Sequence, residues 1–295
     1  MLSQMTGRRT SVVQEQMLLI RILEDRLQGL CDIGEGSDLH FSKGQESIAV
    51  GVGAALRETD YVVAHHRTIA HAVVRGVPLK PLIAELLGKA SGLNGGVAGE
   101  MHLSHLPTRF MFSFQLVGTC IPVAAGLAWA VKHYLKTDDI VVVFHGDAAT
   151  ANGQFHEGLN LAAVNKVPLL LVCENNRLAG NVRPEHYLPV DYVRYRATGY
   201  GIASRYVDAS DVHAVMEAAR EAVAHVRSTR APLMLECATV RLGRHKQGQG
   251  DIRTKEEMAD LALRDPLRDS DPELRRTLEA KVDAVIEEVR RQGAN

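Results

Sequence analysis

Two polar residues near the middle of the chain have the type and spacing of a metal-binding pair. Asp147 follows the apolar stretch 140–145, and Asn176 comes shortly after a second apolar stretch, 167–173. If these stretches form neighbouring parallel strands, both residues lie at the sheet edge where open α/β proteins bind their ligands. A carboxylate and an amide oxygen are hard ligands, which Mg²⁺ prefers when phosphate oxygens complete its coordination.

Each half of this pattern also has an ordinary structural explanation. A Gly-Asp pair after a strand is often only a turn, and an Asn-Asn pair often caps a loop. Either pair alone therefore carries little functional information. Together, at matching positions 29 residues apart, Asp147 and Asn176 favour a magnesium–phosphate site.

The segments that must position this pair are strongly patterned. Residues 155–165 carry apolar side chains on one helical face, between two stretches that are apolar throughout. A strand, a helix and a strand of this length form a right-handed βαβ unit with parallel strands. Strands without polar alternation require a sheet that is covered on both faces. We therefore predict an α/β fold, with a parallel central sheet and helices on both faces.

Further elements are predicted on either side of this unit. Apolar periodicity indicates an N-terminal helix over about 11–31, a strand over 61–64, and helices over 45–56, 78–89 and 121–134. Beyond the unit we predict a helix capped by Ser210, a buried strand over 232–240, and a charged helix over about 272–291. Because no repeat or clear linker divides the sequence, we expect residues 1–295 to form a single domain.

Composition limits the classes of function. The 295 residues are 46% hydrophobic with a formal net charge of −1, so no basic field favours nucleic acid. No apolar run approaches membrane-spanning length, and the N-terminus lacks the apolar segment of a secretory signal. The four cysteines have no C-x-x-C spacing, which argues against a zinc or disulfide framework. We expect a soluble cytoplasmic protein with neither a nucleic-acid nor a membrane partner.

The central stretch resembles a known cofactor signature. Residues 145–177 read HGDAATANGQFHEGLNLAAVNKVPLLLVCENNR, which is similar to the thiamine-diphosphate motif of Gly-Asp-Gly followed by Asn-Asn. More narrowly, they resemble the α subunits of pyruvate, branched-chain 2-oxo acid and acetoin dehydrogenases, whose motif ends in Glu-Asn-Asn. Further stretches similar to that family are HFSKGQES (40–47), HRTIAHAVVRG (66–76), GEMH (99–102) and RLGRHKQGQGDIRTKEE (241–257). The resemblance implies the thiamine-diphosphate-binding fold.

The resemblance also implies a binding site for Mg²⁺ and a diphosphate. Asp147, the Asn176 side chain and the backbone carbonyl of Leu178 would ligate the metal. Arg67 and Arg241 would pair with the diphosphate, since charge-assisted hydrogen bonds to phosphate are strong. Without the aligned motifs, each arginine would be taken for a solvated surface charge. Further contacts to the cofactor are implied for His66, Gln115, Val117, Gly146, Ala148, Ala149 and His245.

Two histidines are the catalytic candidates. By resemblance, His245 would face the substrate as an acid, a base or a charge-stabilising group, which suits an imidazole near neutral pH. His71 lies in the HRTIAHAVVRG match and is the second candidate. A lone histidine is more often a packing or hydrogen-bonding residue, so these roles depend on the aligned motifs.

Several positions depart from the family pattern. Ala148 replaces the third glycine of Gly-Asp-Gly, and Gln115 replaces a glycine near the pyrimidine contact. Ile69 stands where histidine is common, and His66 where tyrosine is common. Lys246 takes the place of a phosphorylated serine or threonine, which argues against that regulation. Because the changes concern groups nearer the substrate, we hypothesise a substrate or acyl acceptor different from that of the housekeeping enzymes.

The function implied by the resemblance is decarboxylation of a small 2-oxo acid, with transfer of the acyl unit to a lipoyl-bearing acyltransferase. In this family a β subunit supplies the glutamate that activates the cofactor, so we expect an α₂β₂ heterotetramer and an inactive isolated chain. Two alternatives stay open: carbon–carbon bond formation with a ketone or aldehyde, and a degenerate scaffold subunit. A nicotinamide-binding fold is disfavoured, because no G-x-G-x-x-G follows a strand.

Overall fold

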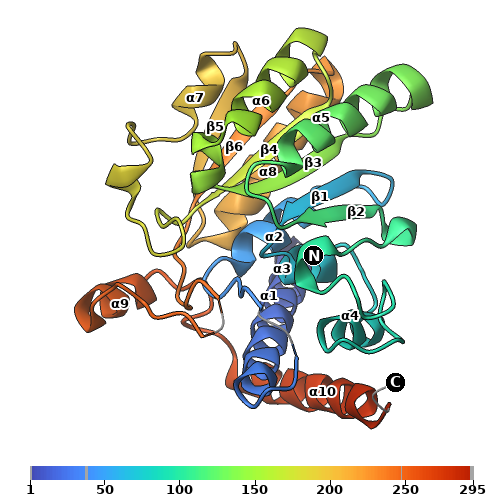
Figure 1. Cartoon of the computed structure of the whole chain (residues 1–295), viewed down its shortest axis with the longest axis vertical. Helices are drawn as coiled ribbons and strands as arrows, with labels where there is room; N and C mark the ends of the chain where they lie inside the picture. The colour runs from blue at the N-terminus through green and yellow to red at the C-terminus, as the bar shows by residue number, and fades with distance from the viewer. Residues whose placement is uncertain (1, 37–38, 247, 293–295) are drawn as a thin grey trace.

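The centre of the protein is a six-stranded sheet. The computed structural model describes residues 2–36, 39–246 and 248–292, with side chains from residue 12 onward. The strand order is β2-β1-β3-β4-β6-β5, and every neighbouring pair is parallel (Figure 1). In that order the strands are Phe110–Phe114, Tyr61–His65, Val141–Gly146, Leu169–Asn175, Leu233–Ala238 and Ala203–Asp208. The predicted parallel α/β sheet is confirmed.

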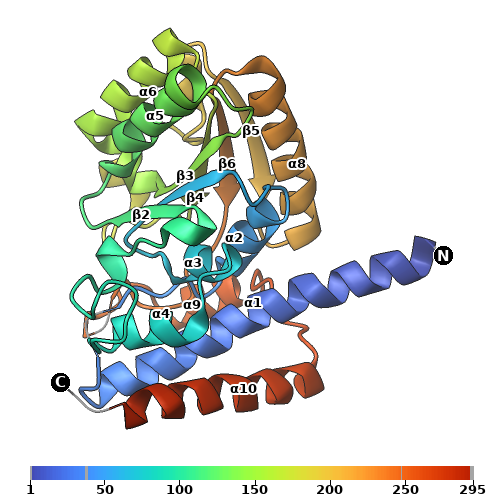
Figure 2. The same cartoon turned by 90° about the vertical axis from the view of Figure 1, so that its right-hand side faces the viewer.

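Helices cover both faces of this sheet, as predicted. Alternate residues of β3 point to opposite sides, since side chains alternate along a strand. Val141 and Val143 pack with α5 (Cys120–Ala130) and α6 (Gly153–Asn165). Val142 and Phe144 pack in a second core with α2 (Glu46–Gly53) and α8 (Val212–Thr229). Figure 2 shows α5 and α6 on one side of the strands and α8 on the other.

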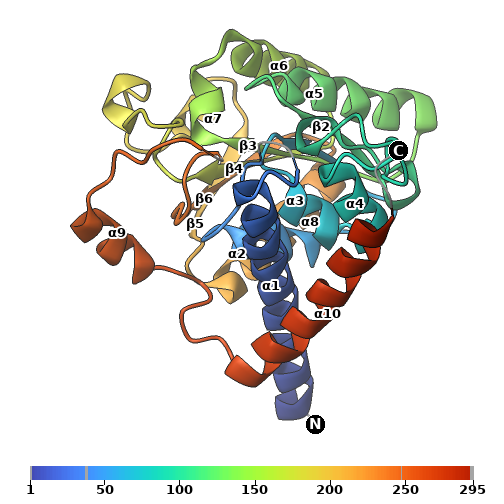
Figure 3. The same ribbon diagram turned by 60° about the horizontal axis from the view of Figure 1, so that its bottom comes forward.

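A further group of helices lies beyond the α2–α8 face. The N-terminal helix α1 spans Leu2–Asp32, so it begins earlier than predicted, and α10 (Pro272–Arg291) runs beside it (Figure 3). The apolar stripe of α10 is buried through Leu278, Val282, Ile286 and Val289. The helix α10 also contacts α4 (Leu79–Leu86), which in turn follows the short helix α3 (Ile69–Val74). Across the described ranges, no helix is both long and apolar enough to cross a membrane.

Some predicted details are wrong or incomplete. The N-cap of α8 is Asp211 rather than Ser210, because the Asp211 carboxylate accepts the backbone N–H of His213 at 2.8 Å. The helix predicted over 121–134 ends at Ala130 and continues as a π-helical turn over Val131–Leu135. Elements outside the predicted set are the edge strands β2 and β5 and the helices α3, α7 (Tyr195–Thr198) and α9 (Lys255–Ala262).

Candidate active site

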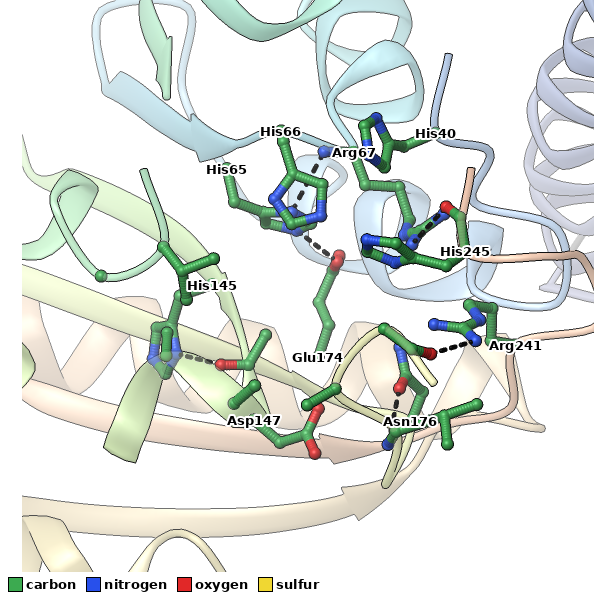
Figure 4. A pocket seen from close by; sticks show the side chains of 18 of the residues that line it. His40, His65, His66, Arg67, His145, Asp147, Glu174, Asn176, Arg241 and His245 are labelled. Carbon is green, nitrogen blue, oxygen red and sulfur yellow. Dashed lines mark hydrogen bonds and ion pairs between the residues drawn. The ribbon is translucent and has the colours of Figure 1, made fainter. Parts of the chain in front are cut away.

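A cavity of about 470 Å³ opens at the carboxyl ends of the central strands (Figure 4). The parallel register of β3 and β4 pairs Gly146 with Glu174, so the residues that follow both strands reach the same edge. Every predicted site residue except His71 lines this cavity: His66, Arg67, Gln115, Val117, Gly146, Asp147, Ala148, Ala149, Asn176, Leu178, Arg241 and His245. Residues distant in sequence thus meet as a parallel sheet requires.

Asp147 and Asn176 form the acidic and amide end of the cavity. Burial raises the pKa of Asp147 to about 6, and a hydrogen bond from the Tyr187 hydroxyl to Asp147 Oδ2, 2.5 Å long, opposes that rise. The Asn176 side chain is oriented at both ends. Its Nδ2 donates to Gln45 Oε1 at 2.9 Å, and its Oδ1 accepts the backbone N–H of Leu178 at 3.1 Å.

Two buried guanidinium groups form the cationic part of the cavity. Arg67 donates to the backbone carbonyls of Phe41 and His245, and Arg241 donates to the carbonyl of Gly180 at 2.7 Å. Among the described residues, neither arginine has a salt bridge to a carboxylate. Burial lowers the pKa of Arg67, and it lowers that of Arg241 to about 9. Nearby carboxylates act on both arginines only from beyond ion-pair distance, so an anion in direct contact with them would offset part of the cost of burying their charge.

The wall of the cavity includes Glu174, a buried carboxylate that lies between the imidazoles of His65 and His71. His65 Nε2 and His71 Nε2 lie 2.7 and 2.9 Å from the two oxygens of Glu174. The backbone N–H of Arg67 donates to His65 Nδ1, so the proton of His65 is on Nε2 and is donated to Glu174. Burial alone would raise the pKa of Glu174, but the imidazoles outweigh it and hold this pKa well below its usual range. His71 does not line the cavity, but it contacts Glu174 and His65, which do.

The positions that depart from the family pattern separate into two groups. Gln115, Ala148, Lys246 and His66 line the cavity. Ile69 does not, because its side chain is fully buried in the core on the α2–α8 face. It cannot contact a substrate directly, and any effect of this departure on specificity has to act through packing.

Several residues of the site have no function predicted from the sequence, and Tyr187, His40 and Gln45 are three of them. Tyr187 lies in an irregular segment and touches Asp147 only because that segment folds back over β3. His40 and Gln45 both line the cavity, and both fall within the HFSKGQES match, which could have drawn attention to them. The side chain of Gln45 orients Asn176, and its buried Nε2 has no hydrogen-bond partner in the described part of the chain.

Comparison with known proteins identifies the family. A family model described as "Dehydrogenase E1 component" matches residues 14–288. This chain belongs to the dehydrogenase E1 component family. The E1 chain is 36% identical over 245 residues to the α subunit of acetoin:2,6-dichlorophenolindophenol oxidoreductase from Bacillus subtilis, covering 82% of this chain and 73% of that protein. It is 33% identical to the pyruvate dehydrogenase E1 component α subunit of Porphyra purpurea, covering 90% and 79%. The corresponding Rhizobium meliloti subunit is 34% identical, covering 82% and 70%.

Enzymes of this family use thiamine diphosphate with a divalent metal ion, and the cavity of the E1 chain fits that cofactor. Asp147 and Asn176 offer hard oxygen ligands at one part of it. Arg67 and Arg241 offer buried positive charge, and the Nε of Arg241 is buried without a hydrogen-bond partner among the described residues. A buried guanidinium donor without a partner is the feature expected of a site built for a phosphate group.

Proposed function

We propose that this E1 chain is the α subunit of an enzyme that decarboxylates a small 2-oxo acid and passes the acyl unit to a lipoyl acceptor. The single observation that carries the proposal is the juxtaposition of Asp147 and Asn176 with the buried guanidinium groups of Arg67 and Arg241 in one cavity. This arrangement suits a magnesium diphosphate. The acetoin- and pyruvate-converting relatives support a small carbonyl substrate.

In the proposed enzyme the chain's own residues bind and orient the cofactor. Asp147, Asn176 and the carbonyl of Leu178 hold the metal, while Arg67 and Arg241 neutralise the diphosphate. Thiamine diphosphate, when bound, supplies the nucleophilic carbon and the electron sink that decarboxylation requires. Additional contacts come from the cavity residues His66, Gln115, Val117, Gly146, Ala148 and Ala149.

His245 is the proton-handling group of the proposed site. Burial lowers its pKa to about 4, with Arg67 and Arg241 adding to the effect, so the imidazole is neutral at pH 7. A neutral imidazole in the cavity can accept a proton or donate a hydrogen bond to the substrate. His71 supports the site from outside the cavity by holding Glu174, so we assign it a positioning role.

We further propose that a β subunit completes the active site in an α₂β₂ heterotetramer. Apolar side chains are exposed next to the cavity and along α5, where Leu116 is 69%, Trp129 45% and Val123 38% exposed. Exposed apolar side chains gathered on one region mark a protein interface. We place the enzyme in the cytoplasm, because its four cysteines are free thiols and a reducing compartment keeps thiols in that state. We also propose that residues 1–295 form a single domain.

Co-purification of this chain with a β-like partner, followed by CO₂ release from a panel of 2-oxo acids, tests the function. We expect release that requires both thiamine diphosphate and Mg²⁺ and that disappears in Asp147→Ala. Transfer of the acyl unit to a lipoyl domain would establish the acceptor. CO₂ release without lipoyl transfer would replace that acceptor by a ketone or aldehyde. A folded complex that binds no cofactor would overturn the proposal in favour of a scaffold subunit.

A further inference from the structure

Three imidazoles meet on the side of the cavity away from Asp147 (Figure 4). His40 precedes α2, His66 follows β1, and His245 belongs to the loop after β6. Their ring centroids lie 4.7 Å (His40–His66), 5.1 Å (His40–His245) and 5.8 Å (His66–His245) apart. One nitrogen from each ring lies within 4.8 Å of the nitrogens of the other two. The cluster is therefore a set of three nitrogen ligands around one point.

The most buried of the three is oriented by a carboxyl group. Glu100 Oε2 accepts the backbone N–H of His40 at 2.8 Å and lies 3.1 Å from His40 Nδ1. Because Nδ1 is engaged by Glu100, Nε2 is the nitrogen of His40 that we assign to the metal. Carboxyl groups behind metal-binding histidines commonly set the tautomer and ring orientation in this way.

All three imidazole rings have a nitrogen available to coordinate a metal ion. Burial lowers the pKa of His40 to about 3, that of His245 to about 4, and that of His66 well below its usual value. All three rings are neutral at pH 7 and keep a lone pair on one nitrogen. His245 Nδ1 is buried and has no hydrogen-bond partner among the described residues. His66 and His245 are half-buried against the cavity, so their side chains have space to rotate.

We propose that His40, His66 and His245 form a binding site for a borderline divalent transition-metal ion, of which Zn²⁺ is the best example. Imidazole nitrogens suit Zn²⁺ and Co²⁺, whereas Mg²⁺ prefers the oxygens of Asp147 and Asn176. Zn–N bonds of about 2.0–2.1 Å in tetrahedral geometry place the nitrogens about 3.4 Å apart, so the rings have to approach one another by up to about 1.4 Å. Three protein ligands leave a fourth position open towards the cavity.

The surrounding charges predict when this site is occupied. Arg67, Arg241 and Lys246 raise the positive potential at His245 and so oppose a cation there. A diphosphate paired with the two arginines would offset that potential. We therefore expect the metal to bind more tightly when thiamine diphosphate is present. An ion at this point occupies cavity space beside His245, so it competes with the 2-oxo acid.

Titration of the full chain with Co²⁺, in excess Mg²⁺, tests the proposal. Co²⁺ held tetrahedrally by imidazoles absorbs visible light far more strongly than octahedral Co²⁺ bound to oxygen. We expect an intense band that saturates at one equivalent, is displaced by Zn²⁺, and appears at lower Co²⁺ concentration with thiamine diphosphate. Asp147→Asn, which alters the oxygen site, should keep the band. This outcome does not depend on catalytic activity, so it separates the proposal from the proposed function.

Ligand and control variants complete the test. His40→Gln and His66→Tyr should each abolish the intense band, and Glu100→Gln should weaken Co²⁺ binding about 10- to 100-fold. His213→Gln, which removes an exposed histidine of α8, should change nothing. Circular dichroism checks that each variant is folded. A weak octahedral spectrum in the parent chain, or an intense band that survives both ligand variants, overturns the proposal.

In the assembled enzyme, Zn²⁺ added in excess Mg²⁺ should raise the apparent KM for the 2-oxo acid. An unchanged KM in a chain that shows the Co²⁺ band would contradict the inferred competition with substrate.

Discussion

At the scale of single residues, the position of Asp147 depends on one partner that lies 40 residues away along the chain. Tyr187 donates a hydrogen bond to Oδ2. This contact restrains the rotation of the carboxylate. Hydrogen bonds to metal-binding carboxylates tune metal affinity in the same manner.

Tyr187→Phe should therefore weaken Mg²⁺-dependent binding of thiamine diphosphate about tenfold, the lower end of the range for such outer-shell partners. Isothermal titration calorimetry at several Mg²⁺ concentrations measures the effect. Tyr192→Phe is the matched control, because Tyr192 belongs to an exposed tyrosine cluster around Arg194. Equal affinities in the parent and Tyr187→Phe would remove Tyr187 from the metal site.

A second residue-scale effect concerns Glu24, a fully buried carboxyl on α1. Its oxygens accept the backbone N–H and the hydroxyl of Ser42, and so anchor the segment that carries His40 and Gln45. Burial, with the neighbouring charge of Glu46, raises the pKa of Glu24 to about 8. Ionisation of this group is therefore unfavourable in the folded protein compared with the unfolded chain.

The sign of the resulting pH dependence follows from linkage. Below pH 4.5 the carboxyl is protonated in both states, and from there to about pH 8 only the folded state holds the proton. The free energy of unfolding should thus fall as pH rises through this window, by at most about 1.4 kcal/mol per pH unit from this group. Glu24→Gln should flatten that slope in urea denaturation curves. A slope equal to that of the parent protein would contradict the raised pKa.

At the scale of elements, the contact between α5 and α6 depends on a residue without a side chain. A Cβ at Gly158 would lie 2.8 Å from Ile121 Cγ2 and 2.9 Å from the backbone nitrogen of Pro122. Because the second neighbour is backbone, it cannot move aside by a change of rotamer. The two helices can therefore pack this closely only with glycine at position 158.

Gly158→Ala should accordingly lower the free energy of unfolding by about 1–3 kcal/mol, the usual cost of overpacking. Gly126→Ala on α5 is the control, because a Cβ there meets nothing within 4 Å. That change should stabilise the isolated chain by up to about 1 kcal/mol, since alanine favours helix more than glycine does. Chemical denaturation of both variants measures these changes in the free energy of unfolding. If Gly158→Ala leaves the free energy of unfolding unchanged, α5 and α6 can move apart without a loss of stability.

At the scale of the whole molecule, α5 and the loop before it carry four of the exposed apolar side chains, namely Leu116, Val117, Val123 and Trp129. The helix α9 lies at the opposite side of the molecule in Figure 1. Since large exposed apolar groups are hot spots when a partner covers them, Trp129 is the side chain on which the proposed β-subunit interface should depend most.

Trp129→Glu should weaken assembly with the β-like subunit by about 2 kcal/mol or more, a thirtyfold change in dissociation constant. Analytical ultracentrifugation of the mixed subunits measures it. Leu263→Glu, which changes an exposed leucine at the end of α9, should leave assembly intact. A complex that tolerates Trp129→Glu would place the interface elsewhere.

Much of the site could be predicted because its parts are locally encoded. Asp147 and Asn176 each follow an apolar strand, and the helix between the strands makes them parallel neighbours. The edge strand β5 cannot be predicted from an apolar run, because most of its residues are partly or fully exposed. The sequence does not distinguish Ser210 from Asp211 as the cap of α8, because both residue types favour that position and only the backbone geometry selects Asp211.

The amino-acid sequence alone determined the family, the parallel sheet and the charged and polar residues that we propose hold the cofactor: Arg67, Asp147, Asn176 and Arg241. These features follow from periodicity and from motifs whose members are close in sequence or matched to a known pattern. Tertiary structure alone decided that Tyr187 touches Asp147, that Ile69 is buried in the core, and that His40 meets His66 and His245. Such contacts join distant segments, and their geometry is set by how whole helices and strands pack, which no local pattern records.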